Sequence, residues 1–163
     1  MPKYRELFIG VDPGQSGGLA VLNKKGQCIT AEKMPSTEFE TAEWFMTFDD
    51  FRVKGMLEKV HAMPGQGVTS MFKFGQNYGF VRGCLFSSGI PFEDVHPKTW
   101  QKEFAITPRK SGEAKGLLKE RLRAKAQQLF PDLAIWSEPR SLGKQRAICD
   151  ALLIAEYCRR KFK

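Results

Sequence analysis

The chain has 163 residues, which at about 100–200 residues per domain predicts one domain and excludes a two-domain enzyme. Its content of 42% hydrophobic and 27% charged residues excludes an intrinsically disordered protein. No apolar run approaches the ~20 residues that span a bilayer, and the first residues lack the order of a signal peptide. We therefore expect a single globular domain over residues 1–163, with no membrane segment.

The basic residues lie mainly in the second part of the chain. Lys and Arg number 26 against 18 Asp and Glu, a formal net charge of +8. Residues 1–95 contain 10 basic and 11 acidic side chains, whereas residues 96–163 contain 16 and 7. Such a basic face favours a polyanionic partner such as nucleic acid. A solvated, lysine-rich helical surface is the alternative.

The first third of the chain predicts three strands and a helix. The strands are expected at Leu7–Val11, Leu19–Leu22 and Cys28–Met34, the first two joined by a glycine-rich turn. Ser36 or Thr37 can cap a helix that runs to Phe48, with acidic residues in its first turn. These strands are expected to form an antiparallel meander.

The rest of the chain alternates strand and helix patterns. The expected elements are a strand at Lys54–His61, a helix at Thr69–Phe86, a strand at Pro91–His96, a helical turn at Pro97–Phe104, a basic loop at Thr107–Gly112, a helix at Glu113–Phe130 and a last helix from about Lys144 to Lys161. The order β-β-β-α-β-α-β-α-α predicts an α/β fold, a mixed sheet flanked by helices.

The four cysteines contain no CxxC pair. They are Cys28, Cys84, Cys149 and Cys158, three of them within apolar segments. We interpret them as reduced core residues, which favours a cytoplasmic protein.

Three carboxylates stand in apolar surroundings, where an unpaired charge is costly. Asp12 ends the first strand, and Glu58 shares a strand face with Met56 and Val60. Asp150 is the one polar residue of the helical run from Ala147 to Ala155. Each acid can be satisfied separately, by a backbone amide or by a basic side chain such as Lys54 or Lys59 for Glu58.

If the three acids converge, they favour a hard divalent cation, Mg²⁺ or Mn²⁺. Beside a groove for a polyanion, such a site predicts phosphodiester hydrolysis without a nucleophilic side chain. Other chemistries fit poorly, since the chain has no Gly-Lys-Ser/Thr phosphate loop, no zinc-ligand spacing and no GxSxG elbow. It is also short for an actin-like sugar kinase.

These motifs, taken in order, resemble the Holliday-junction resolvases of the RuvC type. The resemblance rests on Gly10-Val11-Asp12-Pro13-Gly14, Gly17-Gly18-Leu19-Ala20-Val21, Glu58-Lys59-Val60 and Cys149-Asp150-Ala151-Leu152-Leu153-Ile154-Ala155. His96-Pro97-Lys98-Thr99-Trp100 is similar to a segment of phage and bacterial members. The resemblance to the RuvC-type resolvases implies a ribonuclease-H-like fold, a homodimer and Mg²⁺-dependent paired nicking of four-way DNA junctions. It also implies a cytoplasmic protein of a bacterial cell, encoded by the bacterium or by a phage.

The resemblance also implies roles for single residues. Asp12, Glu58 and Asp150 would be catalytic metal ligands, with Asp12 bridging two ions and a metal-bound water attacking in line. A further acid or histidine is expected about one turn before Asp150, but the chain has Ala147 there, beside Arg146. The site would be completed by water, by another residue or not at all. His61 matches an aromatic wedge that stacks at the junction crossover, and the alternative is a packed core histidine.

Further DNA contacts are expected around this site. Hydrogen bonds to phosphate are expected from the loop and the helix start at residues 63–70, and basic contacts from the region around the basic loop. The candidate residues are Gln66, Thr69, Ser70, Lys98, Arg109, Lys110 and Lys115. Phe72 and Phe74 could stack on bases or belong to the core. The apolar stripe of Thr69–Phe86 is the candidate dimer interface.

The sequence thus predicts a metal-dependent endonuclease that resolves Holliday junctions by paired symmetric nicks. Two alternatives stay open: a non-catalytic module of the same fold that binds branched DNA, and a related nuclease for other branched DNA or RNA–DNA hybrids.

Overall fold

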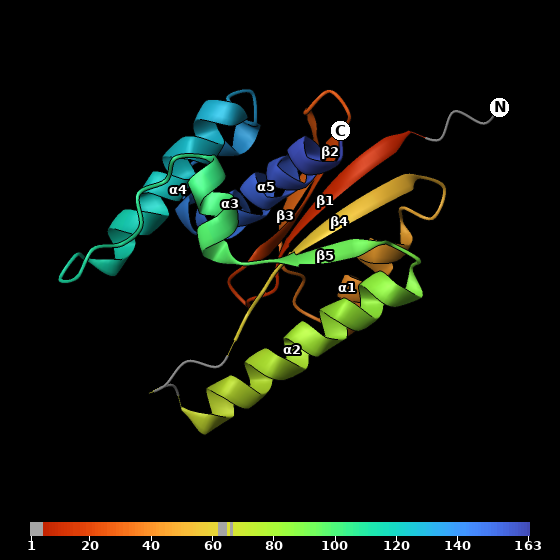
Figure 1. The fold of residues 1–163 in the computed structure, drawn as a ribbon, viewed down its shortest axis with the longest axis horizontal. Helices are drawn as coiled ribbons and strands as arrows, with labels where there is room; N and C mark the ends of the chain where they lie inside the picture. Colours follow the sequence, from red (N-terminus) through yellow and green to blue (C-terminus); the bar gives the residue numbers. More distant parts are fainter. Residues whose placement is uncertain (1–4, 62–64, 66) are drawn as a thin grey trace.

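A computed structural model describes residues 5–61, 65 and 67–163 of the chain, apart from the side chain of Lys115. It contains five strands, five α-helices and a short 3₁₀ helix in this part (Figure 1). The elements are β1 Glu6–Asp12, β2 Gly18–Asn23, β3 Cys28–Lys33, α1 Glu38–Met46, β4 Arg52–Glu58, α2 Val68–Ser87, β5 Phe92–Val95, α3 Pro97–Glu103, α4 Lys115–Leu129, η1 Ala134–Trp136 and α5 Leu142–Phe162. The predicted α/β fold with a mixed sheet is confirmed.

The strands form one sheet in the order β3-β2-β1-β4-β5. The first three strands pair antiparallel as a meander, whereas β4 lies parallel to β1 and β5 parallel to β4. The carboxyl ends of β1, β4 and β5 therefore meet at one edge of the sheet. Residues that follow these three strands are brought together there.

Helices cover both faces of the sheet, as Figure 1 shows. Phe8 and Met56 point to the face covered by α5, with α3 and α4 beyond it. Ile9 and Leu57, which alternate with them, point to the opposite face and pack with residues of α1 and α2. Because β1 is buried on both faces, it reads as a continuous apolar run.

Two glycines allow α5 to lie close to the sheet. A Cβ atom on Gly10 would come within 2.2 Å of the backbone oxygen of Ala151 and the nitrogen of Ala155. On Gly18, it would come within 2.6 Å of the backbone oxygen of Ala147. Any larger residue at these positions would push α5 away. The two glycines flank the helical turn that carries Asp150.

The element boundaries differ from the expected ones where tertiary packing decides them. β4 ends at Glu58 rather than at His61, because pairing with β5 ends there. The turn expected at Pro97–Phe104 is the helix α3, and α5 begins at Leu142 instead of Lys144. Thr37 caps α1 in a capping box with Glu40, as one of the two predicted caps.

Two sequence expectations can be checked against the same part of the chain. All four cysteines have free thiols, and three of them are buried, in agreement with the reduced core residues expected. Among the described residues, no helix combines the length and apolar character that crossing a membrane requires.

Candidate active site

Asp12 and Glu58 end two adjacent parallel strands. Val11 lies opposite Leu57 in the register of β1 and β4, so the next residues, Asp12 and Glu58, leave the sheet at the same edge. Both share the strand face that packs against α5, because their side chains alternate with those of Val11 and Leu57. The parallel pairing thus brings together two carboxylates separated by 46 positions in the sequence.

Asp150 completes the group from the other side. It lies in α5, 7% exposed, one turn from the backbone that Gly10 and Gly18 contact. Its charge raises the pKa of both Asp12 and Glu58, which places the three acids within electrostatic reach of one another. The shared edge of β1 and β4 and these mutual charge effects are consistent with the convergence that the sequence predicts.

The surroundings of Asp12 and Glu58 disfavour the ionised form of both carboxyl groups. Burial, followed by the charge of Asp150, raises the pKa of Asp12 from 3.8 to about 6. Burial, followed by the charges of Asp12 and Asp150, raises the pKa of Glu58 from 4.5 to about 8. Such shifts are typical of functional sites, where a cation is needed to stabilise the ionised carboxylates.

Asp12 and Glu58 each accept a hydrogen bond from one protein donor. The Asp12 Oδ1 atom accepts a hydrogen bond from the backbone N–H of Gly14 at 3.3 Å. The indole N–H of Trp100, in α3, donates to Glu58 Oε2 at 2.9 Å. The alternative in which each acid is satisfied separately is thus partly correct, although Lys54 lies near Glu6 instead of Glu58.

Asp150 is held by a lysine from α4. The Lys119 ammonium donates to Asp150 Oδ2 at 2.6 Å. The Cys149 Sγ atom lies 3.2 Å from both Asp150 Oδ1 and the carbonyl oxygen of Arg146. Burial by itself would lower the pKa of Lys119, but the Asp150 carboxylate outweighs it and the pKa is raised. Lys119 therefore stays charged as the cation of the site.

The donor chemistry fits a divalent cation at Asp12 and Glu58. Both supply carboxylate oxygens, the ligands of Mg²⁺ and Mn²⁺, and both carry a raised pKa that a bound ion would reverse. Within the described residues, however, no three Asp, Glu, His or Cys side chains gather as a ready set of metal ligands. Asp150, engaged by Lys119, contributes its charge and not a third open ligand.

Sequence reasoning missed Lys119 and Trp100. Trp100 belongs to the His96–Trp100 segment that contributed to the resemblance, and this was the available signal. Its full burial is visible only in the structure. For Lys119 the signal was weaker, since it is one of several basic residues on α4. Only the packing of α4 on α5 distinguishes it.

The predicted DNA-binding residues that the structure describes lie at the surface. Thr69 and Ser70 are exposed in the first turn of α2, and Lys98 is exposed in the first turn of α3. Arg109 and Lys110 are exposed in the loop before α4. Gln66 and the side chain of Lys115 lie outside the described residues.

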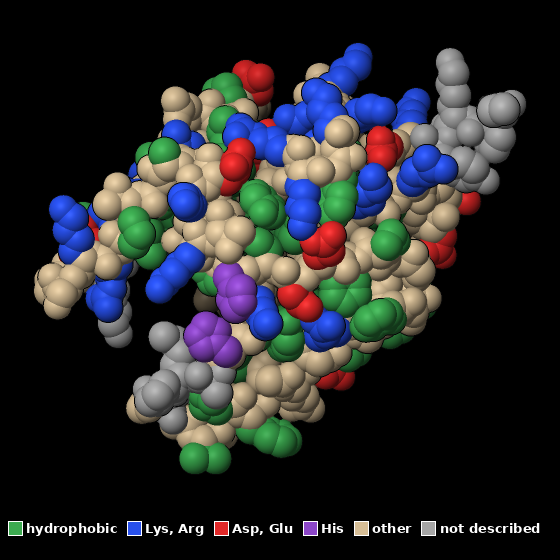
Figure 2. Space-filling model, in the orientation of Figure 1, with side chains coloured by type: hydrophobic (Ala, Val, Ile, Leu, Met, Phe, Trp, Pro, Cys, Tyr) green, Lys and Arg blue, Asp and Glu red, His purple; other side chains and the backbone are tan. Residues whose placement is uncertain are grey.

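Two of the aromatic candidates, His61 and Phe72, lie at the surface. His61 is exposed three residues beyond the end of β4, so it is not a packed core histidine. The Lys59 N–H donates to Val95 O at 2.7 Å, which brings the segment before His61 beside the one before His96. Phe72 is 73% exposed and does not belong to the core. Figure 2 shows both histidines on one face of the protein.

Many of the basic residues in the second part of the chain are paired. Glu113 binds Arg121, Glu120 binds Arg123 and Arg146, and Glu156 binds Arg159 and Arg160. In Figure 2, Lys and Arg gather along the upper edge and again at the left, where the loop before α4 projects. The basic surface that remains near the acids is therefore smaller than the net charge suggests.

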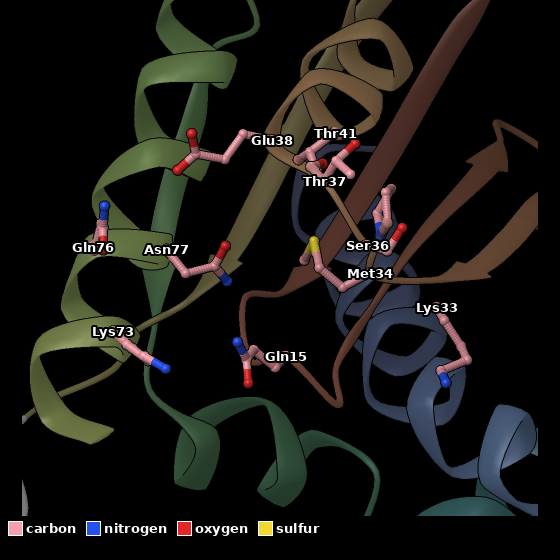
Figure 3. A pocket seen from close by; sticks show the side chains of 11 residues that line it. Gln15, Lys33, Met34, Ser36, Thr37, Glu38, Thr41, Lys73, Gln76 and Asn77 are labelled. Atoms are coloured by element: carbon pink, nitrogen blue, oxygen red, sulfur yellow. The ribbon is translucent and has the colours of Figure 1, made fainter. Parts of the chain in front are cut away.

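A polar pocket of about 520 Å³ lies on the other side of the turn that follows Asp12. Figure 3 shows Gln15 from this turn, Asn77 and Lys73 from α2, and Lys33 around it. The side-chain amide of Asn77 donates to the carbonyl oxygen of Pro13, which ties α2 to the turn. This contact holds the turn after Asp12 on the side that α2 covers.

Comparisons with known proteins identify the fold. No protein family model matches the chain, and no curated protein matches it in sequence. The structure of Thermus thermophilus RuvC in complex with a Holliday junction substrate matches with a TM-score of 0.63 and 17% identity, covering 91% of this chain and 90% of that one. A second structure of Thermus thermophilus RuvC matches with a TM-score of 0.58 and 17% identity, covering 95% and 96%. The chain therefore has the ribonuclease-H-like fold of RuvC.

Proposed function

We propose that this protein is a divalent-metal-dependent endonuclease that cuts branched DNA, with four-way junctions as its substrate. The proposal is carried by Asp12 and Glu58, which end adjacent parallel strands at one edge of the sheet, and by the charge of Asp150, which acts on both. The fold supports it, since the similar Thermus protein has a structure with a Holliday junction substrate. Buried acids that raise each other's pKa are costly for folding, so they indicate a functional demand.

The proposed metal ligands are Asp12 and Glu58, and neighbouring groups orient both carboxylates. Asp12 and Glu58 would hold the ion, with Glu58 oriented by Trp100 and Asp12 by the N–H of Gly14. When bound, a divalent ion activates water and stabilises the leaving oxygen. Since both carboxyl groups have a raised pKa, they release protons as they take up the ion.

The DNA backbone would be positioned by surface residues on both sides of the acids. Thr69 and Ser70 offer hydroxyl groups beside the start of α2, and Lys98, Arg109 and Lys110 offer positive charge. Contacts of this kind fix the register of a duplex without reading its sequence. The exposed ring of His61 is available to stack on a base at the crossover.

A homodimer through α2 would supply two sites for paired cuts. Gly75, Gly79 and Gly83 recur every four residues on α2. Apart from their chain neighbours and the nearby backbone of the helix itself, no atom of the described residues lies within 4 Å of an added Cβ at any of them. The exposed rings of Phe72 and Phe86, at 73% and 69%, lie at the two ends of this helix. Small residues allow close backbone approach, and exposed apolar rings favour burial.

The test is a nicking assay on a labelled synthetic four-way junction, with and without Mg²⁺ or Mn²⁺. Paired symmetric cuts that require metal and disappear in Asp12→Asn would support the resolvase. Competition between the junction and an RNA–DNA hybrid would identify a nuclease with another substrate. Light scattering over a range of protein concentrations tests the dimer, and a monomer throughout would remove the paired-cut part.

A second candidate is a module that binds branched DNA without cutting it. Two observations favour it: the Lys119 ammonium binds the Asp150 carboxylate, and the residue one turn earlier, Ala147, has no metal-binding side chain. This candidate predicts tight junction binding with no product under either metal. An Asp12→Asn variant that binds as tightly as the wild type, with neither cutting, would support it.

A further inference from the structure

A lysine binds one oxygen of Asp150, and a thiol lies beside the other. The Lys119 ammonium lies 2.6 Å from Oδ2, and the Cys149 thiol lies 3.2 Å from Oδ1. The Asp150 side chain is 10% exposed, whereas that of Lys119 is 40% exposed. Lys119 thus reaches the buried carboxylate from the solvent side, where an ion would have to approach.

The helix that carries Asp150 offers no second oxygen ligand nearby. One turn earlier, Ala147 is 2% exposed and packs beside Gly18. The neighbouring Arg146 side chain points to Glu120, which it binds at 2.6 Å. Gln145 uses its amide on Ile135 O and on Ser141. On this turn of α5, Asp150 is the single carboxylate.

The charges of the site match one divalent ion. With an ion bound, the carboxylates of Asp12, Glu58 and Asp150 and the ammonium of Lys119 sum to a charge of −2. One divalent cation neutralises this charge, whereas a second would have to approach the ammonium and leave an excess of positive charge. Repulsion between a second cation and the Lys119 ammonium would be strong in a partly buried site, where water screens charges poorly.

We propose that Lys119 takes the place of a second metal ion, so that the free protein binds one divalent cation, between Asp12 and Glu58. Lys119 is then a positioning residue, which holds Asp150 through a direct ion pair. The proposal rests on the proposed function for the identity of the ion. It replaces the two ions that the resemblance implies with one ion and one fixed ammonium group.

The test is a titration of the full chain with Mn²⁺ in the absence of DNA. Calorimetry measures the number of bound ions, and electron paramagnetic resonance shows whether two ions are coupled. We expect one Mn²⁺ per wild-type chain, without the spectrum of a coupled ion pair. Lys119→Met should bind two, and Lys125→Met, the same change at the surface of the same helix, should bind one. Asp12→Asn should lose the tight site.

Several outcomes would overturn the proposal. Two Mn²⁺ ions in the wild type, none at all, or an unchanged count in Lys119→Met would each do so. If Lys119→Met does not fold, as circular dichroism would show, Lys119→Gln replaces it with the same expectation. Junction cleavage is measured separately: two ions with cleavage refute only the role of Lys119, whereas one ion without cleavage refutes only the proposed function.

Discussion

Replacing Glu58 by glutamine should stabilise the metal-free protein at pH 8. Glu58 is expected to titrate near 4.5 in the unfolded chain, and its pKa in the folded protein is about 8 because it is buried beside Asp12 and Asp150. The folded state therefore holds a proton that the unfolded state has released. Stability from this group is complete below pH 4.5 and is lost as the pH rises toward 8.

The size of the effect follows from the two pKa values. A difference of one unit corresponds to about 1.4 kcal/mol, so the full change from 4.5 to about 8 sets an upper limit of about 5 kcal/mol. Solvent at the half-buried side chain relieves part of this cost, and we expect about 2–4 kcal/mol at pH 8. For a domain of this size, that raises Tm by on the order of 10 °C.

The assay is thermal unfolding of wild type and Glu58→Gln in EDTA between pH 5.5 and 8.5. Glutamine keeps a carbonyl oxygen for the Trp100 N–H, so the hydrogen bond is preserved. The exposed Glu43→Gln on α1 is the control for a lost surface charge. A wild type whose Tm is flat over this range, or a Glu58→Gln that is less stable at pH 8, would refute the reasoning.

Three further predictions follow from the same geometry. Gly10→Ala should lower Tm by roughly 5–10 °C, because its Cβ meets α5 backbone atoms at 2.2 Å. Gly143→Ala, at a helical position where an added Cβ meets no described atom within 4 Å apart from its own helix, should raise Tm slightly, and calorimetry on both variants checks this. Trp100→Phe should weaken Mn²⁺ binding by roughly 10-fold in titrations, since Glu58 loses its N–H donor, and an unchanged affinity would count against the orienting role. Lys110→Ala should reduce the slope of log K for junction binding against log salt concentration by about one, because one phosphate contact is lost. A slope equal to that of the wild type would show that Lys110 does not contact the DNA backbone.

The sequence was informative where the signal is local. Short apolar runs bounded by turn residues indicated β1 and β2, and Ser36 or Thr37 before acidic residues indicated the start of α1. Such runs and caps depend on neighbours a few positions away. Asp150 was identified as unusual by the apolar residues on both sides of it. Such signals need no knowledge of the rest of the fold.

The exposure of single side chains was harder to predict. Phe72 fits an apolar stripe on a helix, but the stripe is wider than the face that α2 buries, so its ring lies in solvent. The stretch to His61 continues a strand pattern, but β5 ends at Val95 and offers no further partner. Hydrophobic periodicity shows which face is apolar and not how much of it is covered.

The sequence alone indicated the α/β class, the order of the strands, the helices α1, α2, α4 and α5, and the three acids, because these depend on residue type and on spacing along the chain. The helix α3 was expected only as a turn. The tertiary structure alone decided what surrounds the acids. Lys119 and Trp100 reach them from α4 and α3, through helix packing that joins residues 31 and 42 positions apart. Contacts at such separation depend on how helices pack on the sheet, and no local pattern in the sequence records them.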